Sequence, residues 1–179
     1  TVTMAPPPGS GGCFFIGANG TANQAGISFI TVDGINCACN IDGGTTNCIN
    51  SAATIGSNGL NNNITLKNLE IKDAYLNGIL MGGSFNSMIN LKIHDVGIIA
   101  NNHAHGLYIA GTDSLIERVE VYNILDAYSI QVYNVAGGVH RNVVRNSYFH
   151  GGQKGVIIAS GDDNVFVNNI VTNTTGPGI

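Results

Sequence analysis

Short apolar segments recur along the chain from residue 64 onward, separated by asparagine, aspartate and glycine. Within each segment apolar and polar residues alternate, which is the period of a strand whose side chains point to opposite faces. We find no 3.6-residue apolar period between the segments, so no helix is expected there. The pattern predicts many short strands joined by tight turns.

The segments align with one another around one polar position, whose copies lie 22, 28, 28 and 22 residues apart. The residues at this first anchor are Asn68, Asn90, Arg118, Asn146 and Asn168. An apolar residue lies two positions before each anchor: Leu66, Met88, Ile116, Val144 and Phe166. Another lies three positions after it: Ile71, Ile93, Val121, Phe149 and Val171. We expect this last set to stack in one inward column, fully buried.

A second anchor is a small residue that opens another strand: Gly78, Gly106, Ser129, Gly155 and Gly178. The strand that follows is expected to begin with an inward residue: Ile79, Leu107, Ile130 and Val156. Three short strands and three turns fit about 22 residues at roughly 3.3 Å per strand residue. A βαβ unit needs about 30 residues or more. Because a single coil of this kind cannot bury its inner face, neighbouring coils must stack on it.

The sequence therefore predicts an all-β solenoid of about six to seven stacked coils over residues 27–179. Residues 1–26 are expected to form an extended N-terminal arm or an incomplete first coil. The chain closes on Gly176-Pro177-Gly178-Ile179, where another coil would open and no polar cap is visible. An open sheet edge is usually covered. We expect either a fragment of a longer chain or end-to-end self-association.

Four motifs carry a resemblance to a known family: Asn68-Leu-Glu-Ile71-Lys-Asp73, Ile93-His94-Asp95, His105-Gly-Leu-Tyr-Ile109 and Gly161-Asp-Asp-Asn164. On these motifs the chain resembles the right-handed parallel β-helix repeat family, the pectate-lyase-like superfamily, over residues 27–179. The resemblance implies a right-handed parallel β-helix. It also implies lyase or epimerase action on uronate sugars at one exposed sheet, although the motifs are more specific for fold than for activity.

Outward positions beside the second anchor are expected to form one polar face. The residue before each anchor points out: Asn77, His105, Tyr128 and Lys154. So does the second residue of each strand: Leu80, Tyr108, Gln131 and Ile157. Tyr133 extends this face beyond Gln131. We assign His105, Tyr108 and Lys154 as candidate catalytic residues, and Tyr128, Gln131 and Tyr133 as candidate substrate-binding residues.

The chemistry that such a face could perform is proton abstraction beside a uronate carboxylate. One group removes or returns the proton, and a cation or hydrogen-bond donor neutralises the carboxylate. Lysine, histidine and tyrosine supply these functions. A polar face of a solenoid is also ordinary solvated or binding surface, so both interpretations stay open.

The longest connection runs from Val96 to His105 and ends at the same face. Insertions in one coil commonly build binding walls. We assign His103, on this connection, and Asp126, the aligned carboxylate of the next coil, to substrate binding. Two histidines do not make a metal site, so no metal ligand is assigned.

Other polar residues have a structural interpretation. Asp73 and Asp95 occupy turn positions where side chains cap backbone groups, and calcium is left open as a cofactor. Asp162 and Asp163 are interpreted as a turn. His94 and His150 are interpreted as structural, because their column also contains lysine, tyrosine and threonine.

The four cysteines, Cys13, Cys37, Cys39 and Cys48, lie in the first 48 residues. Four cysteines allow three disulfide pairings, and the sequence does not choose among them. Disulfides are the preferred interpretation, with buried thiols and a four-thiolate metal site as alternatives. Asn19, Asn63 and Asn173 open N-x-S/T sequons, which agree with an extracellular location.

Composition excludes several classes of protein. Only 10% of residues are charged, the net charge is −4, and the seven lysines and arginines are scattered, so no nucleic-acid-binding stripe exists. No apolar run is long enough for a membrane span. The leading function is recognition of an extracellular polysaccharide, with or without lyase or epimerase action on uronate units. The alternative is a non-catalytic structural, adhesin or filament-forming module.

Overall fold

We describe the protein from a computed structural model. The described residues are 2–4, 12–16, 27–39, 51, 53–55, 61–98, 103–134 and 137–179. These ranges contain strands and turns and no helix. Consequently none of them contains a helix long and apolar enough to cross a membrane.

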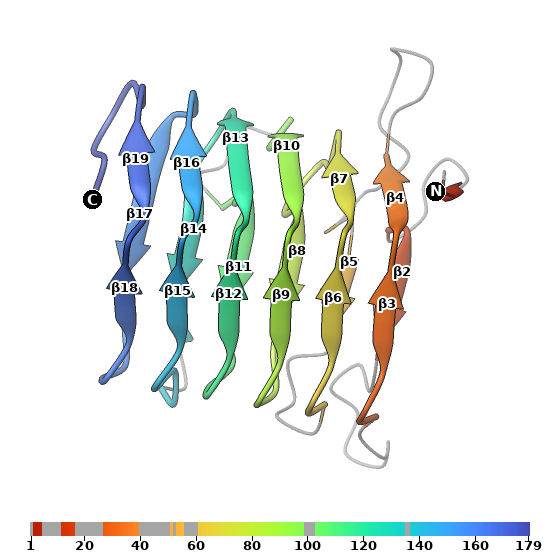
Figure 1. The fold of residues 1–179 in the computed structure, drawn as a ribbon. Helices are drawn as coiled ribbons and strands as arrows, with labels where there is room; N and C mark the ends of the chain where they lie inside the picture. The colour runs from red at the N-terminus through yellow and green to blue at the C-terminus, as the bar shows by residue number, and fades with distance from the viewer. Residues whose placement is uncertain are drawn as a thin grey trace.

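The strands form three parallel sheets, and each coil of the chain adds one strand to each sheet (Figure 1). Sheet 1 contains, in spatial order, β1 (Val2–Met4), β4 (Ile35–Ala38), β7 (Glu70–Lys72), β10 (Lys92–Val96), β13 (Glu120–Ile124), β16 (Tyr148–His150) and β19 (Ile170–Thr172). Sheet 2 contains β2 (Phe14–Ile16), β5 (Ala53–Ile55), β8 (Ile79–Met81), β11 (Leu107–Ile109), β14 (Tyr128–Val132) and β17 (Lys154–Ile158). Sheet 3 contains β3 (Thr31–Asp33), β6 (Thr65–Lys67), β9 (Ser87–Ile89), β12 (Leu115–Glu117), β15 (Val143–Arg145) and β18 (Val165–Val167).

The inward columns lie in the register that the repeat predicts. In sheet 1, Ile93 pairs with Ile71 on one side and with Val121 on the other, and Val121 pairs in turn with Phe149. These four side chains are fully buried. Val171 continues the column in β19 but is only partly buried. The sheet 2 and sheet 3 columns also pair as predicted.

Close contact between sheets explains the small residue at the second anchor. A Cβ on Gly106 would lie 2.4 Å from Cγ1 of Val121 and 2.7 Å from the carbonyl oxygen of Ser129. A Cβ on Gly78 would lie 2.5 Å from Cγ2 of Ile93. The second anchor therefore packs against the inward column of sheet 1, and a larger residue would separate the sheets.

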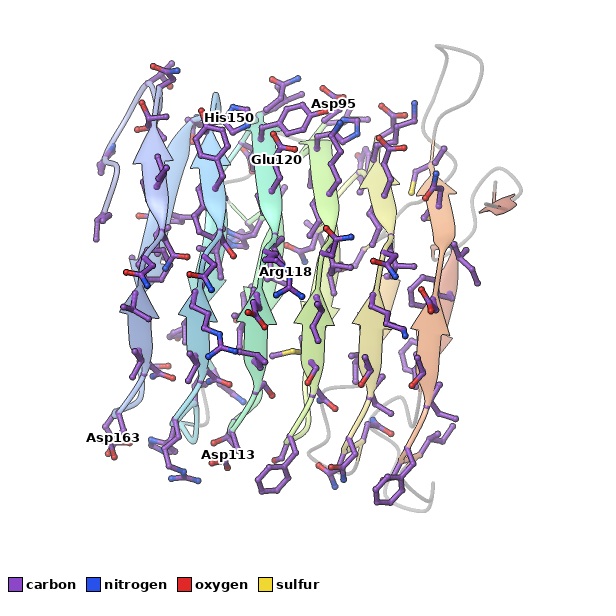
Figure 2. The ribbon with its side chains drawn as sticks, in the orientation of Figure 1. Asp95, Asp113, Arg118, Glu120, His150 and Asp163 are labelled. Atoms are coloured by element: carbon purple, nitrogen blue, oxygen red, sulfur yellow. A yellow bond between two sulfur atoms is a disulfide. The ribbon has the colours of Figure 1, made fainter. Side chains whose placement is uncertain are left out.

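Turn residues in the left-handed conformation form three ladders along the stack, with φ between 52° and 62°. The first contains the first-anchor residues. The second, at the ends of the sheet 1 strands, contains Asp73, Asp95, Asn123, Gly151 and Asn173. The third, at the turns into sheet 3, contains Phe29, Asn63, Phe85, Asp113, Arg141 and Asp163. Figure 2 shows Asp113 and Asp163 in the third ladder, Arg118 in the first and Asp95 in the second.

Buried asparagines satisfy the backbone at the turns into sheet 3. Asn86 is 1% exposed. Its Oδ1 accepts from the N–H of Ile64 at 2.8 Å, and its Nδ2 donates to the carbonyls of Gly82 at 2.7 Å and, on the preceding coil, Asn61 at 3.3 Å. Asn142 makes the equivalent bonds to the preceding coil, accepting from the N–H of Ser114 and donating to the carbonyl of Gly111. Buried backbone groups require such partners, which accounts for part of the abundance of asparagine.

A disulfide joins Cys13 to Cys37, with their Cα atoms 5.9 Å apart. Sγ of Cys39 lies 4.0 Å from Sγ of Cys37. None of the described cysteines is a free thiol, and Cys48 lies outside the described residues. The disulfide interpretation is confirmed for this pair. Because the sulfurs of Cys13 and Cys37 are bonded to each other, Cys13, Cys37 and Cys39 do not form a set of thiolate ligands.

Candidate functional site

The predicted polar face lies on sheet 2. Tyr108 pairs with Leu80 and with Gln131, and Tyr128 pairs with Lys154. His105 lies two residues before β11 of this sheet, and the N–H of the intervening Gly106 donates to the carbonyl of Tyr128. The two outward columns therefore run across neighbouring coils in the predicted order.

His105 is much less exposed than its outward position suggests. Its residue exposure is 2%. The ring of Tyr128 stacks on the imidazole with centroids 6.0 Å apart, and the ring of Tyr108 lies 5.5 Å away at 50°. The N–H of His105 donates to Oδ1 of Asn77 at 2.9 Å. Aromatic neighbours on its own strand and on the next coil thus enclose the imidazole.

Burial also fixes the protonation of His105. The N–H of Tyr128 donates to Nδ1 of His105 at 3.3 Å, so the neutral ring carries its proton on Nε2. Burial, followed by the positive potential of His103, lowers the pKa of His105 from 6.5 to about 4. At neutral pH the side chain is an uncharged imidazole. It can donate from Nε2 but cannot supply a positive charge.

A cleft of about 530 Å³ opens beside His105 on this face. Its lining residues are Leu76, Asn77, Leu80, His103, His105, Tyr108, Ala110, Gln131, Tyr133 and Asn134. The volume falls in the range of small-molecule sites. Burial, with the nearby Tyr133, raises the pKa of the Tyr108 phenol, which therefore stays protonated at neutral pH. Tyr108 can donate a hydrogen bond into the cleft.

Asp126 is not among the lining residues of this cleft, but it binds the backbone of the chain segment that contains the lining residue His103. Its exposure is 4%, and its Oδ2 accepts from the N–H groups of His103 at 3.2 Å and Ala104 at 3.4 Å. The carboxylate therefore fixes the end of the long connection against the next coil. Its backbone contacts give Asp126 a positioning role, with His103 as the exposed residue at the rim.

Lys154 and Tyr128 lie beside the cleft and not among its lining residues. Nζ of Lys154 lies over the Tyr128 ring, 5.2 Å from its centroid. On the next coil, Tyr128 separates the ammonium group from His105. The three candidate catalytic residues therefore do not meet at one point. His105 and Tyr108 line the cleft, whereas Lys154 lies two coils further along the stack.

Sequence reasoning missed Asn134, whose Nδ2 donates to the carbonyl of Ala110 at 3.1 Å and whose N–H donates to Oγ of Ser160 at 3.0 Å. It follows β14 at the start of a second long connection, between β14 and β15. Leu76 and Ala110 were also missed. The signal that could have found Asn134 is this connection, which makes the coil from Arg118 to Asn146 as long as the one before it.

Comparisons with known proteins place the fold. The model of the right-handed β-helix region family matches residues 77–179, more than half of the chain. The chain belongs to the right-handed β-helix family. The crystal structure of pectate lyase Pel9A is similar to this chain, with a TM-score of 0.60 and 16% sequence identity. The likeness covers 99% of this chain and 44% of that chain, so this chain spans less than half of its length. No curated protein matches.

This β-helix carries a second cluster of rings on sheet 1. The Tyr122 ring stacks between the imidazoles of His94 and His150, with centroid distances of 4.6 and 5.1 Å. Nε2 of His94 lies 3.2 Å from Oε1 of Glu70, and Nε2 of His150 lies 3.0 Å from Oε1 of Glu120. Figure 2 shows Glu120 and His150 close together on β13 and β16, two neighbouring strands of sheet 1. These contacts agree with a structural role for both histidines.

No carboxylate cage for a cation is present among the described residues of the β-helix. Their only cluster of three or more histidine, cysteine or acidic groups close enough to hold one ion is the cysteine group near β4. In the second turn ladder, Nδ2 of Asn123 donates to Oδ1 of Asp95. Burial raises the pKa of Asp73 in the same ladder, opposed by Lys72. These groups cap turns, and calcium stays an open prediction.

Proposed function

We propose that this β-helix recognises a polysaccharide, with sugar units held in the cleft of sheet 2. The observation that carries the proposal is the composition of that cleft. Tyr108 and Tyr133 offer aromatic rings, and His105, Gln131 and Asn134 offer polar groups beside them. Aromatic rings with adjacent hydrogen-bonding groups suit the apolar faces and hydroxyl groups of sugar rings.

The shape of the sheet supports a linear ligand. The lining residues come from the coils of β8, β11 and β14, so the cleft runs across coils. Strands lie about 4.8 Å apart in this direction, and a polymer can extend along the stack. The fold that this chain shares with pectate lyase Pel9A agrees with a polysaccharide ligand.

The finer proposal is lyase or epimerase action on uronate units. Tyr108, protonated at neutral pH, would return a proton, and His105 would donate a hydrogen bond from Nε2. Lys154 would act as the base that removes the proton beside the carboxylate. Tyr108 would return a proton to the opposite face of that carbon in an epimerase, or would protonate the leaving glycosidic oxygen in a lyase. The ring of Tyr128 between His105 and Lys154 would support the sugar unit that spans them. Gln131 and Tyr133 would bind neighbouring hydroxyl groups, and His103 would contact the ligand from the rim.

A screen tests both levels of the proposal. Pectin, alginate and glycosaminoglycans are offered with and without calcium, and binding and release of unsaturated products are measured separately. If the face is catalytic, Lys154→Ala and Tyr108→Phe lower turnover strongly while the melting temperature hardly changes. His94→Ala, on sheet 1, is the activity control. Equal loss of turnover in all three variants would indicate misfolding and would contradict the active-face proposal.

A non-catalytic structural module is the second candidate, favoured by one observation. Phe166 and Val171, in the coil of β17 to β19, are only partly buried, whereas the aligned Val144 and Phe149 are 3% and 0% exposed. Further coils of a longer chain would cover them, and so would a second copy stacked on this coil, which is what this candidate requires. Light scattering and electron microscopy of the purified chain would then show particles that lengthen with concentration, and a strictly monomeric chain would contradict this candidate.

We also propose an extracellular location. The Cys13–Cys37 disulfide is compatible with it, because structural disulfides persist mainly in oxidising compartments. Expression with and without a secretion signal, followed by mass spectrometry of the cysteines, tests whether folding requires that bond.

A further inference from the structure

We propose that the cleft of sheet 2 selects uncharged sugar units and that His105 selects them as a fixed hydrogen-bond donor. The uncharged units are neutral sugars or esterified uronates, which share ring hydroxyls and acceptor oxygens and lack an ionised carboxylate. This inference rests on the proposed polysaccharide recognition and names the chemical class that the cleft accepts.

The first step concerns the direction of the hydrogen bond at His105. Nδ1 already accepts from the N–H of Tyr128, so Nε2 carries the ring proton. No described residue accepts a hydrogen bond from Nε2 of His105. The atom is also not fully buried, so a ligand can reach it. Because His105 lines the cleft, Nε2–H is available to a ligand there. An acceptor oxygen of a sugar satisfies it.

The second step concerns charge. None of the described lining residues is an aspartate, glutamate, lysine or arginine. The chain segments next to them that lie outside the described residues, 99–102 and 135–136, contain no charged residue in their sequence either. With His105 neutral, His103 at the rim is the remaining basic group of the lining. The cleft therefore offers hydrogen-bond donors without a lysine or arginine.

The third step weighs a carboxylate in such a place. Transfer of an ionised carboxylate out of water is costly unless a cation or several donors replace the water. Lys154 is the nearest lysine along the column, and its ammonium group lies over the ring of Tyr128. A charged unit of the same polymer would therefore lie over Tyr128 and Lys154, and the unit in the cleft would be uncharged.

Matched ligands test this selection. Oligogalacturonides, their fully methyl-esterified forms and neutral galactan and arabinan oligosaccharides of equal length are titrated calorimetrically at pH 7. We expect an uncharged ligand to bind at least about tenfold more tightly than the acid form, as the loss of one buried polar contact would predict. Comparing the affinities of the methyl-esterified and the neutral oligosaccharides shows which kind of uncharged unit the cleft prefers. Equal or tighter binding of the acid form would overturn the inference and leave the proposed recognition intact. If none of these ligands and no polysaccharide of the screen binds, the selection of uncharged units and the proposed polysaccharide recognition are both overturned.

Two substitutions at His105 separate its roles. His105→Asn keeps an acceptor near Nδ1 for Tyr128 and removes the donor toward the cleft. His105→Gln keeps an N–H near the position of Nε2. We expect His105→Asn to lower the affinity for the uncharged ligand about tenfold, while His105→Gln retains most of it and His94→Asn leaves it unchanged. In a His103→Gln chain, where His105 is the remaining histidine of the lining, this affinity should be constant from pH 5.5 to pH 8. Affinity that rises as the pH falls, or equal loss in both His105 variants with native circular dichroism, would contradict a fixed neutral donor.

Discussion

The backbone N–H of Tyr128 donates to Nδ1 of His105 at 3.3 Å, and the ring of the same tyrosine stacks on the imidazole 6.0 Å away. One residue thus covers the histidine and determines which nitrogen carries its proton. A protonated imidazole would lose this hydrogen bond and would place a charge in a buried position.

This relationship predicts a pH dependence of stability. The pKa of His105 is about 4 in the folded chain and 6.5 when exposed. Between these values the unfolded chain binds more protons, so the free energy of unfolding falls as the pH decreases from 6.5 to 4. At pH 7 the neutral His105 costs no stability, and by pH 4 its protonation in the unfolded chain has lowered the free energy of unfolding by about 3 kcal/mol. Urea unfolding of the native chain and of His105→Gln at pH 7.5 and pH 4.5 measures this loss. The variant should lose less stability, and equal losses would contradict the prediction.

The buried column of sheet 1 predicts a folding defect. Val121 is fully buried between Ile93 and Phe149. Val121→Asp would place a carboxylate where no water or cation reaches it, and we expect no folded protein. Val165→Asp is the matched control, because Val165 points outward and is 46% exposed. Circular dichroism and the soluble yield distinguish the two, and a folded Val121→Asp protein would contradict the packing.

The third turn ladder predicts a stabilising substitution. Phe85 has φ of 57° and is 59% exposed, whereas Asn63 occupies the equivalent turn with φ of 58°. Left-handed backbone costs a bulky residue about 1 kcal/mol or more, and asparagine tolerates it better. Phe85→Asn should therefore raise the free energy of unfolding by about 1 kcal/mol. The reverse change, Asn63→Phe, should lower it. If Phe85→Asn destabilises the chain, the ring makes a contact that outweighs the strain.

The position of Asp126 predicts a local change in the cleft wall. Asp126→Ala removes the acceptor for the N–H groups of His103 and Ala104. Hydrogen exchange should become faster at these amides while exchange in β13 and β14 stays slow. Ligand affinity should fall with it. Asp126→Asn keeps one acceptor oxygen, so its exchange rates at these amides should lie between those of the native chain and those of Asp126→Ala. Unchanged exchange at residue 104 would show that other contacts hold the wall.

The sequence predicts the stack well because the strand period and the repeat are both local signals. Ile71, Ile93, Val121 and Phe149 repeat at fixed distances from the first anchor, and any parallel stack places them in one column. The second anchor is small for a reason that only the structure gives, namely its contact with the sheet 1 column. The third turn ladder was missed because its residues include phenylalanine and arginine, which do not indicate a left-handed turn.

The candidate site was predicted less completely because it depends on side chains from different coils. The register of the two outward columns was predicted, and His103, His105, Tyr108, Gln131 and Tyr133 line one cleft. The burial of His105 was not predicted, because alternation along a strand says which way a residue points and not what covers it. Likewise the separation of Lys154 from the cleft depends on where the Tyr128 ring lies.

Coils of unequal length pair without a shift in register. Ile93 pairs with Ile71 and with Val121 although the anchors of these coils are spaced by 22 and 28 residues. The extra residues lie in the two connections that border the cleft. A one-residue insertion inside a strand would turn its side chains to the wrong face, whereas growth at these two corners leaves the core untouched. The walls of the cleft can therefore change, in evolution or by loop grafting, separately from the stability of the scaffold.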